Sequence, residues 1–340
     1  MDITIFDYDL PNWFIAQEPL VQRDKSRLMV LDRKDEEIRH KNFFQIIDYL
    51  KVDDLLVLND SKVVPARLFG YKKETGGKVE ALLLNSLSDY RWQALLKPGR
   101  KASPGTEIIF SSQLKAMVIS KDEEQGVFIL DMKTEGNFTE ILQKIGKVPT
   151  PPYIKKELKN STCYQTVYSR REGSIAAPTA GIHFTKELLT QIKNKGIEII
   201  YLTLHIGRGT FELVKVNQVE QHRMKEELYT ITSENAKAIN QALLEKRRIV
   251  GVGTSVTRAL ESAFINDRVT AGTRWTSLFI YPGYCFKVIN ALITNFHLPR
   301  STPLMLASAF AGKEFLFKAY QVAIQENYRF YSFGDAMLII

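Results

Sequence analysis

The 340-residue sequence contains only two cysteines and no long apolar run. Two thiols, at Cys163 and Cys285, are too few for a disulfide framework or a zinc site built on thiolates. No segment has the length and hydrophobicity of a membrane span, and residues 1–4 lack the basic start and apolar core of a signal peptide. We therefore expect a cytoplasmic protein that binds neither a membrane nor a metal ion.

Complete nucleotide-binding motifs are also missing. The sequence has no phosphate-binding P-loop motif and no serine-hydrolase nucleophile motif. Gly251-Val252-Gly253 resembles the start of a dinucleotide fingerprint, but Val256 occupies the place of the third glycine. A tight turn from strand to helix and a ligand site are equally good explanations of these glycines.

The overall composition is that of a globular protein with a basic surface. Hydrophobic residues make up 45% and charged residues 25% of the chain, and the formal net charge is +8. A positive excess favours a polyanionic partner such as RNA. A basic protein without a nucleic-acid partner has the same composition, so charge alone does not decide between the two.

Two different patterns of secondary structure divide the chain. Between residues 67 and 130, short runs of β-forming residues alternate with turn residues, which predicts a small antiparallel barrel. After residue 150, helices alternate with strands, including one expected at residues 277–280, which predicts a largely parallel sheet. The expected fold is α/β, a mixed, mostly parallel sheet with flanking helices, interrupted by an inserted small antiparallel β-barrel domain. We expect an α/β catalytic domain at residues 1–66 and 150–340, and the barrel at 67–149.

Three histidines occupy short segments bounded by glycine or proline. His297 lies in Thr294-Asn295-Phe296-His297-Leu298-Pro299, where an apolar run ends and the proline disfavours helix in the residues before it. His183 ends a run of small residues, and His205 follows a strand. Histidine near a strand end suits acid–base chemistry because its pKa lies near 6.5. A structural histidine at a turn explains each segment taken alone.

We hypothesise that these histidines share one pocket with two carboxylates. Asp60 follows the buried strand at residues 55–58 and could act as a base or hold a ribose hydroxyl. The expected catalytic residues are His183, His205, His297, Asp60 and Asp335.

Ligand-binding candidates come from the same strand ends and helix starts. Small residues let the backbone approach a ligand closely, and an arginine can hold a carboxylate or phosphate through two parallel hydrogen bonds. The expected cofactor-binding residues are Thr179, Gly181, Arg208, Gly253, Thr254 and Asn295. A packed loop or a surface arginine remains an alternative for each. The basic side chains expected to contact RNA are Arg67, Lys97, Arg100 and Lys101.

Several segments in order along the chain carry a resemblance to a known family. They include Asn59-Asp60-Ser61-Lys62, Leu96-Lys97-Pro98-Gly99-Arg100, Ala176-Ala177-Pro178-Thr179-Ala180-Gly181, Leu204-His205-Ile206-Gly207 and Thr294-Asn295-Phe296-His297-Leu298-Pro299. With them the sequence resembles, from end to end, the S-adenosylmethionine:tRNA ribosyltransferase-isomerase family of queuosine biosynthesis.

The resemblance implies a reaction and its partners. The enzyme would move the ribosyl part of S-adenosylmethionine onto 7-aminomethyl-7-deazaguanine at the wobble position of tRNA. Rearrangement would give epoxyqueuosine, with adenine and methionine released. S-adenosylmethionine would be a co-substrate, with no permanently bound cofactor, and we expect a monomer.

Departures from the family pattern and two rival functions stay open. Lys62 stands where the family has arginine, Lys225 replaces a histidine, and Arg300 replaces a lysine. An S-adenosylmethionine-dependent RNA methyltransferase would need a fuller glycine-rich loop than residues 251–253 offer. A non-catalytic tRNA-binding protein fits the charge but leaves the three histidine segments unexplained.

Overall fold

The computed structural model describes residues 1–156, 158, 160–207, 209 and 213–340, which form two compact units. The larger unit contains residues 1–62, 151–171 and 177–340, and the smaller contains 63–150 and 172–176. Between the units the chain runs along β4 (Ser61–Val63) and β11 (Arg171–Ser174), which pair as a two-stranded sheet.

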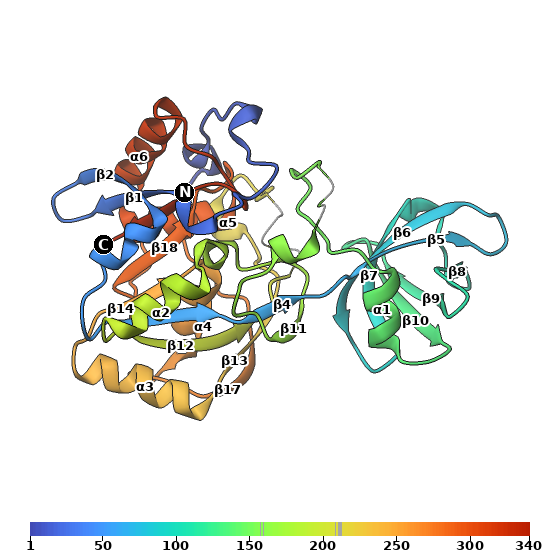
Figure 1. Ribbon diagram of the computed structural model, residues 1–340. Coiled ribbons are helices and arrows are strands. Elements are labelled where there is room, and N and C mark those ends of the chain that lie inside the picture. The colour runs from blue at the N-terminus through green and yellow to red at the C-terminus, as the bar shows by residue number, and fades with distance from the viewer. Residues whose placement is uncertain (157, 159, 208, 210–212) are drawn as a thin grey trace. The chain divides into compact units, whose positions relative to one another are not determined.

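A nine-stranded mixed sheet forms the centre of the larger unit (Figure 1). In order across the sheet its strands are β17 (Gly272–Thr276), β13 (Glu227–Ile231), β12 (Glu198–Leu204), β3 (Leu55–Asn59), β14 (Ile249–Val252), β18 (Ala291–Asn295), β19 (Ala336–Ile339), β1 (Arg27–Asp32) and β2 (Glu37–Asn42). The four strands β12, β3, β14 and β18 run parallel, so their carboxyl ends meet at one edge. Since β19 runs antiparallel to β18 and parallel to β1, both β19 and β1 begin at this same edge.

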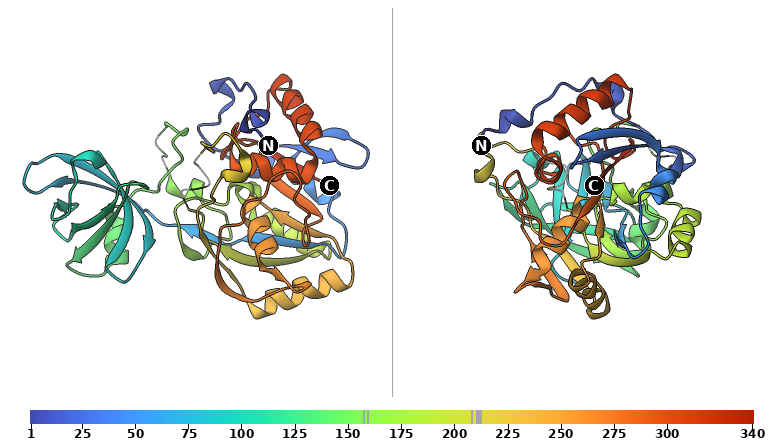
Figure 2. Two further views of the ribbon diagram at one scale, coloured as in Figure 1. Left: turned by 180° about the vertical axis from the view of Figure 1, so that it is seen from behind. Right: turned by 90° about the vertical axis from the view of Figure 1, so that its left-hand side faces the viewer.

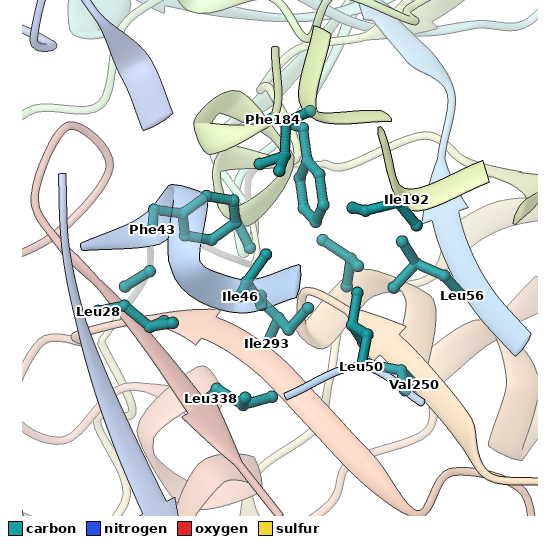
Figure 3. Close-up of a cluster of buried hydrophobic side chains, with 14 of the residues drawn as sticks. Leu28, Phe43, Ile46, Leu50, Leu56, Phe184, Ile192, Val250, Ile293 and Leu338 are labelled. Atoms are coloured by element: carbon teal, nitrogen blue, oxygen red, sulfur yellow. The ribbon is translucent and has the colours of Figure 1, made fainter. Parts of the chain in front are cut away.

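Alternate strand residues point to opposite faces of this sheet, and each face is covered by helices. Leu56, Val250 and Ile293 lie on the first face, in a core that includes side chains from the 3₁₀ helix η4 (Phe43–Asp48) and α2 (Lys186–Asn194) (Figure 3). We call this the α2 face.

The second face is covered by α4 (Thr254–Ala263). Gly251 lies between Val250 and Val252, so a Cβ added to it would point away from the α2 face. That Cβ would lie 3.5 Å from Thr257 Oγ1 and 3.7 Å from Val256 Cγ1 of α4. The other α-helices described in the larger unit are α3 (Ser233–Leu244), α5 (Thr302–Ala311) and α6 (Lys313–Gln325), drawn from two further sides in Figure 2. We call this second face the α4 face.

The smaller unit is a closed antiparallel barrel with its own core. Its strands, in order around the barrel, are β10 (Val127–Thr134), β7 (Arg91–Lys97), β6 (Lys78–Ser86), β5 (Arg67–Lys72), β8 (Glu107–Ile109) and β9 (Leu114–Asp122). Helix α1 (Phe138–Ile145) contributes Ile141 and Leu142 to the barrel core. The mixed sheet and the inserted barrel confirm the fold class expected from the sequence.

One predicted strand is wrong. Residues 277–280 form no strand, and β17 ends at Thr276. The Arg258 side chain donates to the carbonyl oxygens of Leu278 at 2.9 Å and Thr276 at 3.5 Å, so these acceptors serve a side chain instead of a neighbouring strand. Within the described part of the chain, no helix combines the length and the apolar character needed to cross a membrane.

Candidate functional site

Polar side chains replace apolar ones where the parallel strands end on the α2 face. The alternation that buries Leu58 of β3 and Ile293 of β18 continues to Asp60 and Asn295, two residues further along each strand direction. Both side chains are buried, at 2% and 3% exposure. Because buried polar groups need hydrogen-bond partners, each one organises its surroundings.

His183 is held on this face by contacts with Phe43, Asn295 and Ser26. It ends the 3₁₀ helix η7 (Thr179–His183), just before Thr185 caps α2. Its ring stacks on Phe43 of η4 with centroids 4.9 Å apart. Burial lowers the pKa of His183 to about 3, so the imidazole is neutral near pH 7.

Asn295 fixes the tautomer of this histidine. Its side-chain Nδ2 donates to His183 Nε2 at 3.1 Å, while its Oδ1 accepts from the Thr179 hydroxyl at 3.0 Å. Nε2 is therefore the acceptor of the ring, and Nδ1 carries the proton. Nδ1 lies 2.7 Å from Ser26 Oγ, so it donates there and leaves the Ser26 hydroxyl hydrogen free to point elsewhere.

A pocket opens beside this serine–histidine pair. Its lining includes Arg23, Ser26, Ile182, His183, Ser332 and Phe333. The Arg23 guanidinium is positioned by the carbonyl oxygens of Gln165 at 2.6 Å and Thr162 at 3.0 Å. The pocket therefore presents an anchored cation and two hydroxyl-bearing residues next to a neutral imidazole.

Asp60 and His205 form a second polar group on the same edge. Asp60 accepts from the Thr203 hydroxyl at 2.6 Å and forms an ion pair with Arg170. Burial lowers the pKa of His205, and the nearby Asp60 carboxylate opposes that shift. Among the described residues, the buried Nδ1 of His205 has no hydrogen-bond partner. This ring is therefore neutral near pH 7, with one nitrogen that no described group occupies.

Small residues pack tightly in the segment that carries His183 and at the start of α4. A Cβ on Gly181 would lie 2.0 Å from the Tyr168 hydroxyl, so only glycine fits there. Gly253 has a φ of +90° and caps α4, and a Cβ there would lie 3.6 Å from Ala180. Thr254 is the first residue of α4. Packing and backbone geometry explain both glycines, and their role in ligand binding remains a prediction.

His297 lies on the opposite face of β18. Its Nε2 is 2.8 Å from Thr294 Oγ1, whereas His183 contacts the next residue, Asn295. Adjacent residues of a strand point to opposite faces. The His297 backbone N–H donates to the Tyr320 hydroxyl of α6 at 2.8 Å, and burial lowers the pKa of this histidine to about 3. The expectation that all three histidines line one pocket is therefore wrong for His297.

Asp335 is engaged by the backbone. Its two carboxylate oxygens accept the N–H groups of Arg27 at 2.9 Å and Arg329 at 2.7 Å, and burial raises its pKa. These contacts join the start of β1 to the loop before β19 and favour a structural role over the catalytic one expected from the sequence.

The remaining predicted residues lie elsewhere. Arg208 is outside the described residues, and so is the side chain of Lys101. On the barrel, Arg67 forms an ion pair with Glu80 at 3.2 Å, while Lys97 and Arg100 are exposed. Their contact with RNA remains a prediction.

Sequence reasoning did not assign Arg23, Ser26 and Ser332 to the site. Arg23 and Ser26 lie directly before β1, which begins at Arg27. Their position before β1 could have pointed to the site, since β1 begins at the edge of the sheet where the parallel strands end. Among the described residues, no group of three or more histidine, cysteine or acidic side chains is placed to hold a metal ion.

Comparison with known proteins agrees with this fold. A family model described as queuosine biosynthesis protein matches residues 3–339. The chain belongs to this family.

Two relatives of this family member are similar over nearly their whole length. A protein of Caldanaerobacter subterraneus subsp. tengcongensis is 52% identical over 336 residues, which cover 98% of each chain. One of Clostridium kluyveri is 51% identical over 341 residues, covering 100% of each. Both are named S-adenosylmethionine:tRNA ribosyltransferase-isomerase.

A solved structure is similar as well. The crystal structure of an S-adenosylmethionine tRNA ribosyltransferase from Thermotoga maritima is 38% identical to this chain, with a TM-score of 0.58. The match covers 99% of this chain and 100% of the other.

Proposed function

We propose that this protein transfers the ribosyl part of S-adenosylmethionine to 7-aminomethyl-7-deazaguanine at the wobble position of tRNA and isomerises it, giving epoxyqueuosine-tRNA. Adenine and methionine leave. The observation that carries this proposal is the family match over residues 3–339, with named relatives at 51% to 52% identity along their whole length. A match of that extent includes every strand end that builds the candidate site.

The carboxyl edge offers groups suited to the proton transfers that this reaction requires. The positive sulfur of S-adenosylmethionine acidifies the neighbouring ribose methylene, so a neutral base can remove a proton from it. We assign this role to His205, since its ring is neutral near pH 7 and no described group occupies its Nδ1.

We assign His183 and Ser26 a second role, at the pocket. Because His183 donates through Nδ1 to Ser26, the serine hydroxyl can donate its own hydrogen to a bound substrate. Departing adenine develops negative charge on its ring, and a hydrogen bond donated by the Ser26 hydroxyl stabilises that charge. Both nitrogens of His183 already have partners, so its action passes through Ser26.

The barrel supplies the cations for the tRNA backbone in this proposal. Lys97 and Arg100 are exposed, and together with Arg67 and Lys101 they would contact phosphates. The protein would act as a cytoplasmic monomer, with S-adenosylmethionine as co-substrate and no resident cofactor. Size measurement by light scattering, with and without tRNA, tests the monomer.

Product analysis tests the function. The protein is incubated with labelled S-adenosylmethionine and tRNA carrying the deazaguanine, and free adenine and methionine are expected in equal amounts with the modified tRNA. S-adenosylhomocysteine as the product would instead show a methyltransferase. tRNA binding without any turnover would show a non-catalytic binding protein.

Variants test the assigned roles. We expect His205→Ala to slow adenine release about a hundredfold to ten-thousandfold, the usual contribution of a positioned acid or base. Ser26→Ala should slow it by a similar factor, and Ser26→Thr should restore part of the rate. His297→Gln is the matched control, since its ring lies on the α4 face, and its turnover should stay within a few-fold of the unmodified protein at neutral pH.

A further inference from the structure

The outward side of β5 carries two neighbouring exposed aromatic rings. Leu68 of this strand is buried in the barrel core, so the alternating positions 67, 69 and 71 face outward. Phe69 is 49% exposed and Tyr71 is 47% exposed. Single exposed apolar residues are common on protein surfaces, but here two successive outward positions of one strand both carry aromatic rings, which we call the aromatic strip.

Basic side chains surround this strip. The Lys147 ammonium lies 5.7 Å from the centroid of the Phe69 ring, and Lys78 of β6 is paired directly across from Tyr71. On the next strand, β7, Lys97 is paired directly across from Glu80 of β6.

Two ion pairs and two further lysines lie near the rings. Arg67 pairs with Glu80 at 3.2 Å, and Lys73 pairs with Glu107 at 2.7 Å. Lys78 and Lys97 are exposed, so they add positive charge on the neighbouring strands.

We propose that Phe69 and Tyr71 form a base-stacking platform for unpaired nucleotides of RNA, with the surrounding lysines on the phosphates. The proposal rests on the proposed function for the identity of the RNA, a tRNA. Aromatic faces inside a basic groove are the usual means of holding single strands, since every base has a face that can stack.

The spacing of the rings selects single-stranded RNA over a duplex. Residues two apart on a strand are separated by about 6.7 Å. Bases in a helical strand rise by only about 3.4 Å each. Two consecutive bases can therefore occupy both rings only when the strand is extended and its bases are unstacked from each other. Loops of RNA present bases in this state.

The test compares binding of a transcribed, unmodified tRNA to the full-length protein and its variants. Phe69→Ala/Tyr71→Ala should bind about tenfold or more weakly, with an unchanged slope of log affinity against log salt. Phe69→Tyr/Tyr71→Phe should restore the affinity because it keeps both rings. Lys78→Ala/Lys97→Ala should weaken binding and flatten the salt slope by about one unit or more.

Controls separate this idea from its alternatives. Tyr90→Ala removes another exposed barrel aromatic, which lies outside β5, and should leave the affinity unchanged. A duplex RNA competitor should compete less well than a single-stranded oligonucleotide of equal length. Should the double alanine variant be poorly folded, Tyr71→Ala alone gives the same comparison.

Three results would overturn the platform. In the first, Phe69→Ala/Tyr71→Ala binds RNA as tightly as the unmodified protein. In the second, Tyr90→Ala loses as much RNA affinity as the double variant. In the third, the double variant keeps its RNA affinity and loses only self-association of the protein. Failure of the proposed function gives a different pattern, since the protein would then release no adenine while the platform could still bind RNA.

Discussion

Acid should weaken the larger unit through its buried histidines, and His297 allows this effect to be isolated. Its ring is partly buried on the α4 face against Thr294, and burial lowers its pKa to about 3. In the unfolded chain the same group titrates near 6.5. Between these two pH values the unfolded state binds more protons than the folded state. The unfolding free energy is therefore unaffected by this histidine above about pH 6.5 and falls as the pH drops toward 3.

The size of the effect follows from the two pKa values. Each pH unit below about 6.5 removes about 1.4 kcal/mol of unfolding free energy, so one such histidine loses about 2 kcal/mol at pH 5. His183, whose pKa burial also lowers to about 3, contributes a second loss of similar size. Replacing His297 by glutamine should therefore remove about 2 kcal/mol of the acid sensitivity at pH 5 while leaving the contributions of His183 and His205.

Hydrogen exchange of peptides covering β18 measures the opening free energy of this region at pH 7.5 and pH 5, after correction for intrinsic exchange rates. Between these pH values His297→Gln should lose about 2 kcal/mol less than the unmodified protein. Thr294→Val is the matched control, since it removes the hydrogen-bond partner but keeps the histidine, and it should retain the full acid sensitivity. Equal losses in His297→Gln and the unmodified protein would refute the reasoning.

Three further substitutions test contacts near the site. Arg258→Met should destabilise the protein by about 3–5 kcal/mol in thermal or urea unfolding because it leaves the buried Glu227 carboxylate without its ion-pair partner. Arg258→Met/Glu227→Leu should recover much of this, and no recovery would contradict the explanation. Gly181→Ala should cost about 1–3 kcal/mol, chiefly through its clash with the Tyr168 hydroxyl, and Tyr168→Phe should relieve part of that cost, since contacts with Thr166 Cγ2 at 3.0 Å and the Tyr168 ring at 3.1 Å remain. No relief would show that the hydroxyl is not the cause. Asp335→Asn should cost about 1–3 kcal/mol because one backbone N–H loses its acceptor, with turnover of the folded variant within about twofold; a large fall in kcat at unchanged stability would instead show a catalytic Asp335.

Local patterns were sufficient to predict the fold class. Short β-forming runs separated by turns predicted the barrel, and the alternation of helix and strand predicted the covered sheet. Helix ends carried clear local signals as well, since Thr185 and Ser301 cap α2 and α5 through their own side chains. These signals act over a few residues, so they can be read along the chain.

The strand at residues 277–280 was predicted wrongly because the deciding contact is distant in sequence. Arg258, about twenty residues earlier, takes the carbonyl oxygens that a strand would have needed. The antiparallel pairing of β13 with β12 and β17 likewise depends on partners that no local pattern specifies.

The sequence by itself determined the two kinds of architecture, the starts of α2 and α5, and the strand ends where polar side chains gather. Only the tertiary structure decided which of those polar groups meet. One step along β18 separates Asn295, which reaches His183, from Thr294, which reaches His297 on the other face. The sequence also could not show that Ser26 lies beside His183, 157 positions away. Such pairings depend on strand order and on which face each side chain occupies, and these are set when the whole sheet assembles and buries its two faces.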